Sequence, residues 1–321
     1  YNEYIELSDY YRNVIDCNSG LNIPLVFIGS SFDFNKKTSG SPWSKFPNGK
    51  FFIPKTLLIS KKGRKELFSI STSNNTDKQN LTGSNLKKSN FKIKCELQSE
   101  TSKNKFTQII NESIDMIESN QISKVVLSRQ KHYKIDSNQN ILFNFLKNAE
   151  KEPIGTTSFI YDFKEKGTFF GVTPETLFNI KDNILKTEAL AGTVEDNCKA
   201  GSKELEEHSY VVDYIADTLS NFSDKINLNK SPTLFNLGKI SHLHTKIKSD
   251  INKGYDIFDI LYKMHPTPAV AGIPKKESLD IISSLEKHNR GWYGGPLGWI
   301  DSKFSANFVV GIRSGFIDDD D

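Results

Sequence analysis

The sequence predicts an α+β fold built around large, mostly antiparallel sheets. Four strand-like runs follow one another over residues 155–188 with no helix among them, and two further strands joined by a short turn fill residues 295–317. Amphipathic helical runs stand between these groups of strands and do not alternate with single strands. Such grouping is typical of antiparallel sheets and argues against a series of βαβ units.

The first hundred residues are predicted to hold short strands and loops. The runs "IPLVFIGSSFDF" (23–34) and "GKFFIPKTLLIS" (49–60) are apolar and rich in β-branched and aromatic residues, as strands are. Between them, "SGSPWSKFPNG" (39–49) has the Gly, Pro and Ser of a turn-rich connection. Residues 72–90 are polar with few apolar side chains, so we expect a surface loop there, with a composition that also suits disorder.

The pattern of apolar residues becomes regular after residue 101. Apolar residues three and four apart predict a helix over 102–119, and a strand is expected to follow over 123–135. A long helix is predicted over 202–222 with Ser202 as its N-cap. The other elements predicted in this part are helices at 140–150, 254–264 and 275–288, strands at 155–162, 167–172, 175–180 and 183–188, and a strand-like run at 234–250.

Between the last two predicted helices lies the stretch "KMHPTPAVAGIPKKES" (263–278), which contains Pro266, Pro268 and Pro274. Proline fixes φ and removes a backbone donor, and it pushes the preceding residue toward extended geometry. We therefore expect a rigid, non-helical corner, which either connects elements or presents backbone groups to a ligand.

Charge and composition argue against several classes of protein. The net charge is +3, from 42 basic and 39 acidic residues spread along the chain, so a nucleic-acid partner is not expected. Cys17, Cys95 and Cys198 are far apart, which argues against a disulfide framework or a structural zinc site and fits a reducing compartment. No run of eighteen apolar residues predicts a membrane span, and no signal-like segment opens the chain, so a cytoplasmic location is expected.

Two residues suit acid–base chemistry. Lys124 opens a strand in "SKVVLSR", where burial would lower its pKa and make it a general base; the alternative is an exposed lysine at a strand end. Glu175 follows Pro174 in "FFGVTPETLF", between two strands, which suits a general acid; the alternative is an ordinary glutamate of a turn.

Two further segments suit the binding of charged groups. In "TEALAGTVE", Gly192 lets the backbone N–H groups around Thr193 approach an anionic ligand, unless the segment is a simple turn. In "KELEEH", Glu204 and Glu207 lie one helical turn apart, so their oxygens suit Mg²⁺. The alternative is a solvated acidic first turn that complements the helix dipole.

The C-terminal part adds polar candidates. His242 and His244 in "SHLHTKI" share one strand face, but further ligands at zinc-like spacing are absent, so we expect hydrogen bonding. Tyr293 stands in the glycine-rich "RGWYGGPLGWID". Arg313 in "VVGIRSG" could clamp a carboxylate bidentately or form a structural ion pair. The sequence has no GxxxxGK[ST], no strand–GxGxxG–helix unit and no GxSxG, so nucleotide-binding folds and the hydrolase nucleophile elbow lack support.

Taken in order, these segments resemble the chorismate-utilising enzymes, and most closely the isochorismate synthases among them. The resemblance spans roughly residues 28–315 and implies αββα layers, with two large packed antiparallel sheets flanked by helices. It also implies one chorismate-binding domain over 1–321, with 1–100 as an N-terminal part and 101–321 as the catalytic core. The segments that carry it are "PW..F", "KVVLSR", "GVTPETLF", "TEALAGT", "KELEEH", "HLHTKI", "HPTPAVAGIP", "RGWYGGPLGWID" and "IRSG".

The resemblance implies a role for each candidate. Lys124 is the expected base that activates water for attack at C2 of chorismate, and Glu175 is the expected acid that protonates the departing C4 hydroxyl. Glu207, with Glu204 beside it, is expected to bind Mg²⁺ against a substrate carboxylate. The positions that match substrate-binding residues are Gly192, Thr193, His242, Tyr293 and Arg313.

The same resemblance implies a role for the proline-rich corner in the choice of nucleophile. Ala269 occupies the place where ammonia-using relatives, such as anthranilate synthase, usually carry threonine, and a small apolar residue there fits water as the nucleophile. The chain departs from the family at its end, because it stops at Asp321 where relatives continue into a glycine-rich strand and a helix with further Mg²⁺-binding glutamates. That C-terminal metal-binding segment is therefore expected to be missing. "AGTVEDN" also lacks the arginine that often follows "AGT".

Three functions are consistent with these features. The first is a Mg²⁺-dependent isochorismate synthase, serving menaquinone or siderophore synthesis. The second is a salicylate synthase or an aminating relative. The third is a catalytically impaired binding or partner subunit, suggested by the departure at the C-terminus. In each case we expect chorismate as the small-molecule partner, no nucleic acid, no membrane, and a monomer or weak homo-oligomer.

Overall fold

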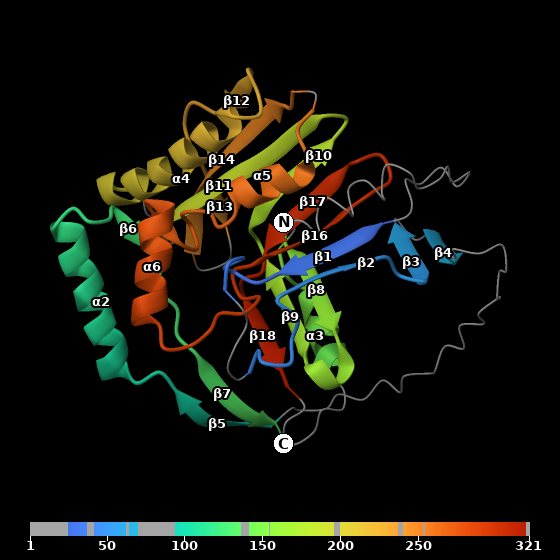
Figure 1. The fold of residues 1–321 in the computed structure, drawn as a ribbon, viewed down its shortest axis with the longest axis horizontal. Helices are drawn as coiled ribbons and strands as arrows, with labels where there is room; N and C mark the ends of the chain where they lie inside the picture. The colour runs from blue at the N-terminus through green and yellow to red at the C-terminus, as the bar shows by residue number, and fades with distance from the viewer. Residues whose placement is uncertain are drawn as a thin grey trace.

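The chain forms the predicted α+β fold around one large antiparallel sheet, as the computed structural model shows (Figure 1). The predicted loop at 72–90 lies outside the residues that the structure describes. No helix in the described part is long and apolar enough to cross a membrane. The described residues are 25–36, 42–61, 64–69, 94–135, 141–153, 155–195, 200–236, 240–252 and 254–318.

The large sheet contains nine strands and unites distant parts of the chain. Its order is β12-β14-β11-β10-β17-β16-β1-β2, with β13 pairing alongside β14. Every pairing is antiparallel, as the grouping of strands in the sequence predicted. The strands are β1 (Val26–Ser30), β2 (Gly49–Phe52), β10 (Thr176–Lys181), β11 (Ile184–Glu195), β12 (Ile226–Leu228), β13 (Thr233–Asn236), β14 (Ile240–Asp250), β16 (Pro296–Ile300) and β17 (Ala306–Val310).

The other strands form small sheets. Among the described residues the second sheet layer is three-stranded, in the order β18-β9-β8, and so is smaller than the first. The predicted strand at 123–135 is divided into β6 and β7, because its two ends pair with different partners. The strands of the small sheets are β3 (Thr56–Lys61) with β4 (Arg64–Ser69), β5 (Cys95–Glu100) with β7 (Lys131–Ile135), β6 (Lys124–Val125) with β15 (Gly272–Ile273), and β18 (Ser314–Ile317) with β9 (Thr168–Thr173) and β8 (Thr157–Asp162).

The helices begin and end close to their predicted limits. They are α2 (Lys103–Glu118), α3 (Ile141–Ala149), α4 (Ser202–Ser220), α5 (Ile257–Met264) and α6 (Lys275–Leu285), with a short 3₁₀ turn at Lys164–Lys166. The N-cap of α4 is Gly201 and not the predicted Ser202, and its backbone N–H donates to Oε2 of Glu204 at 2.9 Å. This bond satisfies a backbone donor that the start of a helix leaves unpaired.

Helix α4 lies along β11 and β14 (Figure 1) and closes the main hydrophobic core. Val211, Ile215 and Leu219 line its inner face at the spacing that one helical stripe requires, and they pack with Leu185 of β11 and Ile247 of β14. Burial of each such side chain contributes about 1.5–3 kcal/mol. This packing fixes the helix that carries Glu204 and Glu207 against the central strands.

A second, aromatic cluster joins the three-stranded sheet to the large one. Trp292 is fully buried and meets the rings of Phe46 and Tyr161 edge-on, at centroid distances of 4.9 and 5.2 Å. The Tyr161 hydroxyl donates to the carbonyl of Ile28 in β1 at 2.9 Å. Aromatic pairs in this geometry add to the burial of their area, so the two sheets are held together beside the glycine-rich turn that carries Tyr293.

Candidate active site

Lys124 is held by the proline-rich corner. Its two-residue strand pairs with β15, placing Lys124 opposite Ile273, and the amide of Val126 donates to the carbonyl of Ala271 at 2.8 Å. The Lys124 ammonium lies 3.2 Å from Oε1 of Glu207 in α4. The Lys124 side chain is 14% exposed and that of Glu207 is 41% exposed. The corner, the base candidate and the metal-ligand candidate therefore meet at one place.

Glu175 is buried between β9 and β10. Its backbone is fixed on both sides, because its N–H donates to Oγ1 of Thr173 and its carbonyl accepts from Val310. Its Oε1 accepts a hydrogen bond of 3.3 Å from the hydroxyl of Thr267, in the corner. Burial raises the pKa of the Glu175 carboxyl to about 7, although the Thr267 hydrogen bond and the charge of Lys124 oppose the rise. A carboxyl with such a pKa still holds its proton close to neutral pH.

A second carboxylate stands near Glu175. Oε2 of Glu188 in β11 lies 2.6 Å from Nε2 of the buried His244 in β14. Burial alone would raise the pKa of Glu188, but hydrogen bonds from His244 and Thr176 and the charges of His244 and Lys246 lower it. The negative charge of Glu188 in turn contributes to the raised pKa of Glu175. His244 thus forms hydrogen bonds, as the sequence predicted for this pair of histidines.

A bulge in β11 presents Gly192 and Thr193. The register between β11 and β14 shifts between Ala191 and Thr193, so that Thr193 lies opposite His242. Gly192 has φ +77°, and a Cβ there would lie 2.5 Å from the carbonyl oxygen of Glu204. Only glycine avoids both the left-handed strain and this overlap with α4.

His242 connects the bulge to two charged candidates. Its Nδ1 lies 3.1 Å from Oγ1 of Thr193. Burial lowers the pKa of His242, the charge of Arg313 lowers it further, and the charge of Glu207 and the backbone of Gly192 oppose the shift. A neutral imidazole next to Thr193 can both donate and accept hydrogen bonds to a ligand.

The remaining candidates lie on turns at the edge of this group. Arg313 has φ +47° in the link between β17 and β18, and its carbonyl accepts from the amide of Val172. Tyr293 is 37% exposed; burial raises the pKa of its hydroxyl, the charge of Arg290 opposes the rise, and the charges of Glu286 and Glu175 add to it. Ala269 is half-buried within the corner.

The described residues fit a magnesium ion through one carboxylate. Glu207 is partly exposed and lies beside the base, whereas Oε2 of Glu204 accepts the capping bond from Gly201. No group of three His, Cys, Asp or Glu side chains in the described ranges surrounds a metal-sized space. Mg²⁺ usually keeps several waters and takes one or two protein carboxylates together with substrate oxygens. Glu207 is one such carboxylate, and the metal-binding roles of both Glu207 and Glu204 stay predictions.

The structure thus connects most of the predicted residues through contacts and charge. Lys124 forms an ion pair with Glu207, and the charge of Lys124 lowers the pKa of Glu175. The charges of Glu207 and Arg313 act in opposite directions on the pKa of His242. Sequence reasoning missed Thr267, the hydroxyl that binds the acid. The only available signal was its place between Pro266 and Pro268, where a rigid backbone fixes a side chain.

Comparison with known proteins identifies the family of the chain. The family model described as chorismate binding enzyme matches residues 6–321. Isochorismate synthase MenF of Bacillus subtilis is 30% identical over 327 residues, which cover 92% of this chain and 67% of that protein. Isochorismate synthase MenF of Haemophilus influenzae is 33% identical over 221 residues, 65% of this chain and 51% of that protein. The aligned regions cover about two thirds of the first relative and half of the second.

Solved structures show the same fold. MenF from Escherichia coli, the menaquinone-specific isochorismate synthase, superposes with a TM-score of 0.77 at 23% identity, over 98% of this chain and 74% of that one. Anthranilate synthase component I from Streptococcus pneumoniae superposes with a TM-score of 0.79 at 17% identity, over 98% and 78% of the two chains. Because the family model matches residues 6–321, which are nearly the whole chain, the chain belongs to the chorismate binding enzyme family.

Proposed function

We propose that this chain is an isochorismate synthase, which isomerises chorismate to isochorismate with the help of Mg²⁺. The observation that carries the proposal is the placement of Glu175 and Lys124, in which the charge of Lys124 acts on the buried Glu175 carboxyl. Glu175 is a buried carboxyl with a pKa of about 7, and Lys124 is a neighbouring amine that lies against a second, more exposed carboxylate. Two titratable groups with such different surroundings suit the two ends of one displacement.

The chemistry needs one group to take a proton and another to give one. Lys124 in its amine form accepts a proton from water, whose oxygen attacks C2 of chorismate. Both ring double bonds shift by one bond toward C4, and the C4 hydroxyl leaves as water after it receives the proton of Glu175. The net change is an isomerisation, because one water enters and one departs. General acid and general base catalysis each contribute typically 10²–10⁴-fold.

The other residues are proposed to bind and orient the substrate. Arg313, His242 and Thr193 provide donors suited to the carboxylates of chorismate, and Tyr293 is a hydroxyl whose pKa the charge of Glu175 helps to raise. When bound, Mg²⁺ would neutralise a substrate carboxylate, with Glu207 as its ligand from the described residues. The half-buried Ala269 would leave room for water beside the ring.

A product assay tests the proposal. Chorismate is incubated with the protein in the presence of Mg²⁺ or of a chelator, and the products are separated by chromatography. We expect isochorismate that depends on Mg²⁺ and is lost in Lys124→Ala and in Glu175→Gln. Glu206→Gln is the matched control, because this exposed carboxylate of α4 accepts a hydrogen bond from the nearby Tyr210 hydroxyl on the same helix. Salicylate with pyruvate as the product would contradict the proposal, as would a folded protein that binds chorismate without turnover.

A further inference from the structure

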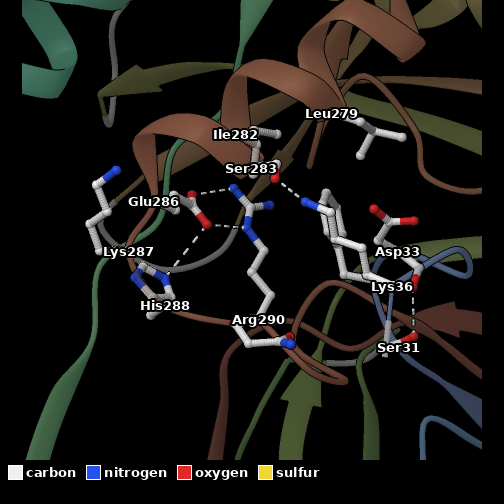
Figure 2. A pocket seen from close by; sticks show the side chains of 12 residues that line it. Ser31, Asp33, Lys36, Leu279, Ile282, Ser283, Glu286, Lys287, His288 and Arg290 are labelled. Carbon is white, nitrogen blue, oxygen red and sulfur yellow. Dashed lines mark hydrogen bonds and ion pairs between the residues drawn. The ribbon is translucent and has the colours of Figure 1, made fainter. Parts of the chain in front are cut away.

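Behind the corner lies a buried ion pair that the proposed chemistry does not use. Glu286 directly follows α6, and Arg290 lies four residues further along the chain. Nε and Nη2 of Arg290 donate to the two carboxylate oxygens of Glu286, at 2.8 and 2.5 Å. The two side chains are 4% and 2% exposed. Figure 2 shows the pair at the wall of a pocket, with the carboxylate of Glu286 facing the guanidinium.

The same guanidinium reaches two segments of the candidate active site. Nη1 of Arg290 donates to the carbonyl of Val270 at 2.9 Å, next to Ala269 in the corner. Nη2 donates to the carbonyl of Val126 at 2.7 Å, two residues after Lys124. These four bonds use most of the five N–H donors that a guanidinium has. Arg290 is therefore directed at protein groups and not at a substrate.

Glu286 also bonds the segment that carries Lys124. Its Oε1 accepts from the backbone N–H of Ser128 at 2.6 Å, so the carboxylate also holds the segment that carries Lys124. The face of the Phe32 ring lies 4.3 Å from the Arg290 guanidinium carbon. The Phe32 carbonyl in turn lies 2.9 Å from Nε2 of His265, at the start of the corner. The pair thus bonds the base segment and the corner to one rigid group.

We propose that Arg290, held by Glu286, is a positioning residue that sets the separation between Lys124 and the corner that carries Thr267 and Ala269. The inference rests on the proposed function, since the separation matters for a base and an acid acting on one ring. A planar, bidentate guanidinium can bond the carboxylate and two carbonyls at once, and a lysine ammonium cannot reproduce that geometry. Misplacement of reacting groups by about 1 Å can reduce a rate ~10²-fold.

The pocket beside the pair allows a direct test. It has a volume of about 280 Å³, and Phe32 is among its lining residues. Glu286 and Arg290 line it as well (Figure 2). In Arg290→Ala, free guanidinium at millimolar concentration can enter through this pocket and occupy the place of the lost group. We expect kcat for isochorismate formation to fall ~10²-fold with little change in KM, and guanidinium, but not methylammonium, to restore part of kcat in a saturable way.

Controls separate positioning from a general loss of structure. Lys287→Ala removes a basic side chain from the same pocket, whose ammonium donates to the nearby Ser284 carbonyl, and it should keep the wild-type kcat. Lys124→Ala should not respond to guanidinium. If Arg290→Ala does not fold, Arg290→Lys takes its place, and a similar loss of kcat is expected in folded protein. Wild-type kcat in either folded Arg290 variant would overturn the proposal, as would a loss expressed only in KM.

A second readout does not depend on turnover. Hydrogen exchange of the backbone amides of Val126 and Ser128 should accelerate in Arg290→Ala and slow again when guanidinium is added, because Val126 donates to the corner and Ser128 donates to Glu286. Unchanged exchange would contradict the positioning role. If wild-type protein makes no isochorismate but exchange responds as described, the proposed function fails while the structural role of Arg290 stands.

Discussion

Glu175 and Glu207 are two glutamates of the candidate site that lie in different surroundings. Glu175 is 9% exposed, lies between two strands and has a hydroxyl as its hydrogen-bond partner. Glu207 is 41% exposed at its side chain, stands on a helix and forms an ion pair with Lys124. Burial raises the pKa of the first carboxyl to about 7, whereas the second carboxyl lies against an ammonium at the edge of the solvent.

This difference separates proton transfer from charge binding. The acid side lies at the connection between β9 of the three-stranded sheet and β10 of the large sheet, so its position is fixed by the packing of both sheets. The base side is assembled from three separate pieces: β6 pairs with β15 of the proline-rich corner, and α4 reaches β6 through the ion pair between Glu207 and Lys124. We expect substitutions on the acid side to change protonation, and substitutions on the base side to change geometry and cation dependence.

The largest effect on cation dependence is expected from Glu207→Gln. The change removes the charge beside Lys124 and the proposed Mg²⁺ ligand, so kcat/KM should fall ~10²-fold or more and the Mg²⁺ concentration needed for half-maximal rate should rise. Glu204→Gln is the matched variant on the same helix. Its carboxylate caps α4, so the expected cost is about 0.5–1 kcal/mol of stability. A Glu204 variant as impaired as the Glu207 variant would show that both carboxylates bind the cation.

Glu175→Gln should raise stability at alkaline pH while it removes activity. The folded-state pKa of about 7 lies above the ordinary value of 4.5, so the folded protein binds the proton more tightly than the unfolded chain does. Wild-type stability therefore falls as pH rises from about 4.5 through about 7, by roughly 3 kcal/mol at most. Glutamine has no such dependence.

The measurement is a denaturant titration of both proteins between pH 5 and 8. The gap in unfolding free energy between the variant and the wild type should open with rising pH. A gap that stays constant across this range would mean that the Glu175 carboxyl ionises as in an ordinary exposed glutamate.

Gly192→Ala tests whether β11 of the large sheet must lie close to α4, the helix that carries Glu207. The new Cβ would lie 2.5 Å from the Glu204 carbonyl at φ +77°, so α4, which carries Glu207, must shift away from β11. The matched control is Gly254→Ala, which also has a positive φ, +100°, but where an added Cβ would meet no atom within 4 Å. We expect about 1–3 kcal/mol more destabilisation at Gly192 than at Gly254, measured by thermal unfolding. Equal losses would show that α4 accommodates the methyl group.

The smallest effect is expected from Thr267→Val. The Thr267 hydroxyl lowers the pKa of Glu175, so its removal should raise that pKa and move the alkaline decline of kcat/KM to higher pH. The shift should stay below about one pH unit, because one hydrogen bond contributes roughly 1 kcal/mol and one pKa unit corresponds to about 1.4 kcal/mol. Thr156→Val, which removes a hydroxyl bonded to the Pro153 carbonyl, is the control. A decline that moves to lower pH would contradict the assigned hydrogen bond.

Much of the fold could be predicted because its signals are local. The stripe of Val211, Ile215 and Leu219 predicts α4, and the run of strands after residue 155 predicts the antiparallel order. The cap of α4 was missed by one residue, since Ser202 has the better capping side chain, yet Glu204 bonds the amide of Gly201 instead.

The candidate site could be predicted only as far as its segments are recognisable. The roles of Thr267 and Arg290 could not be predicted, because their hydrogen-bond partners are far away in the sequence. The separation is 92 residues for Thr267 and up to 164 residues for Arg290. No period or spacing along the chain reports such contacts. The division of the strand at 123–135 had the same origin, because β6 takes its partner from the corner and β7 pairs with β5.

The order of strands in the large sheet has a consequence for folding during synthesis on the ribosome. β16 and β17 lie between β10 and β1, although they follow both in the sequence. Until residues 296–310 have left the exit tunnel, β10 and β1 each have an edge with open backbone groups, and such edges invite pairing with other chains. The nascent chain therefore carries two unfinished half-sheets after β10 has emerged, until β16 and β17 emerge and complete both at once.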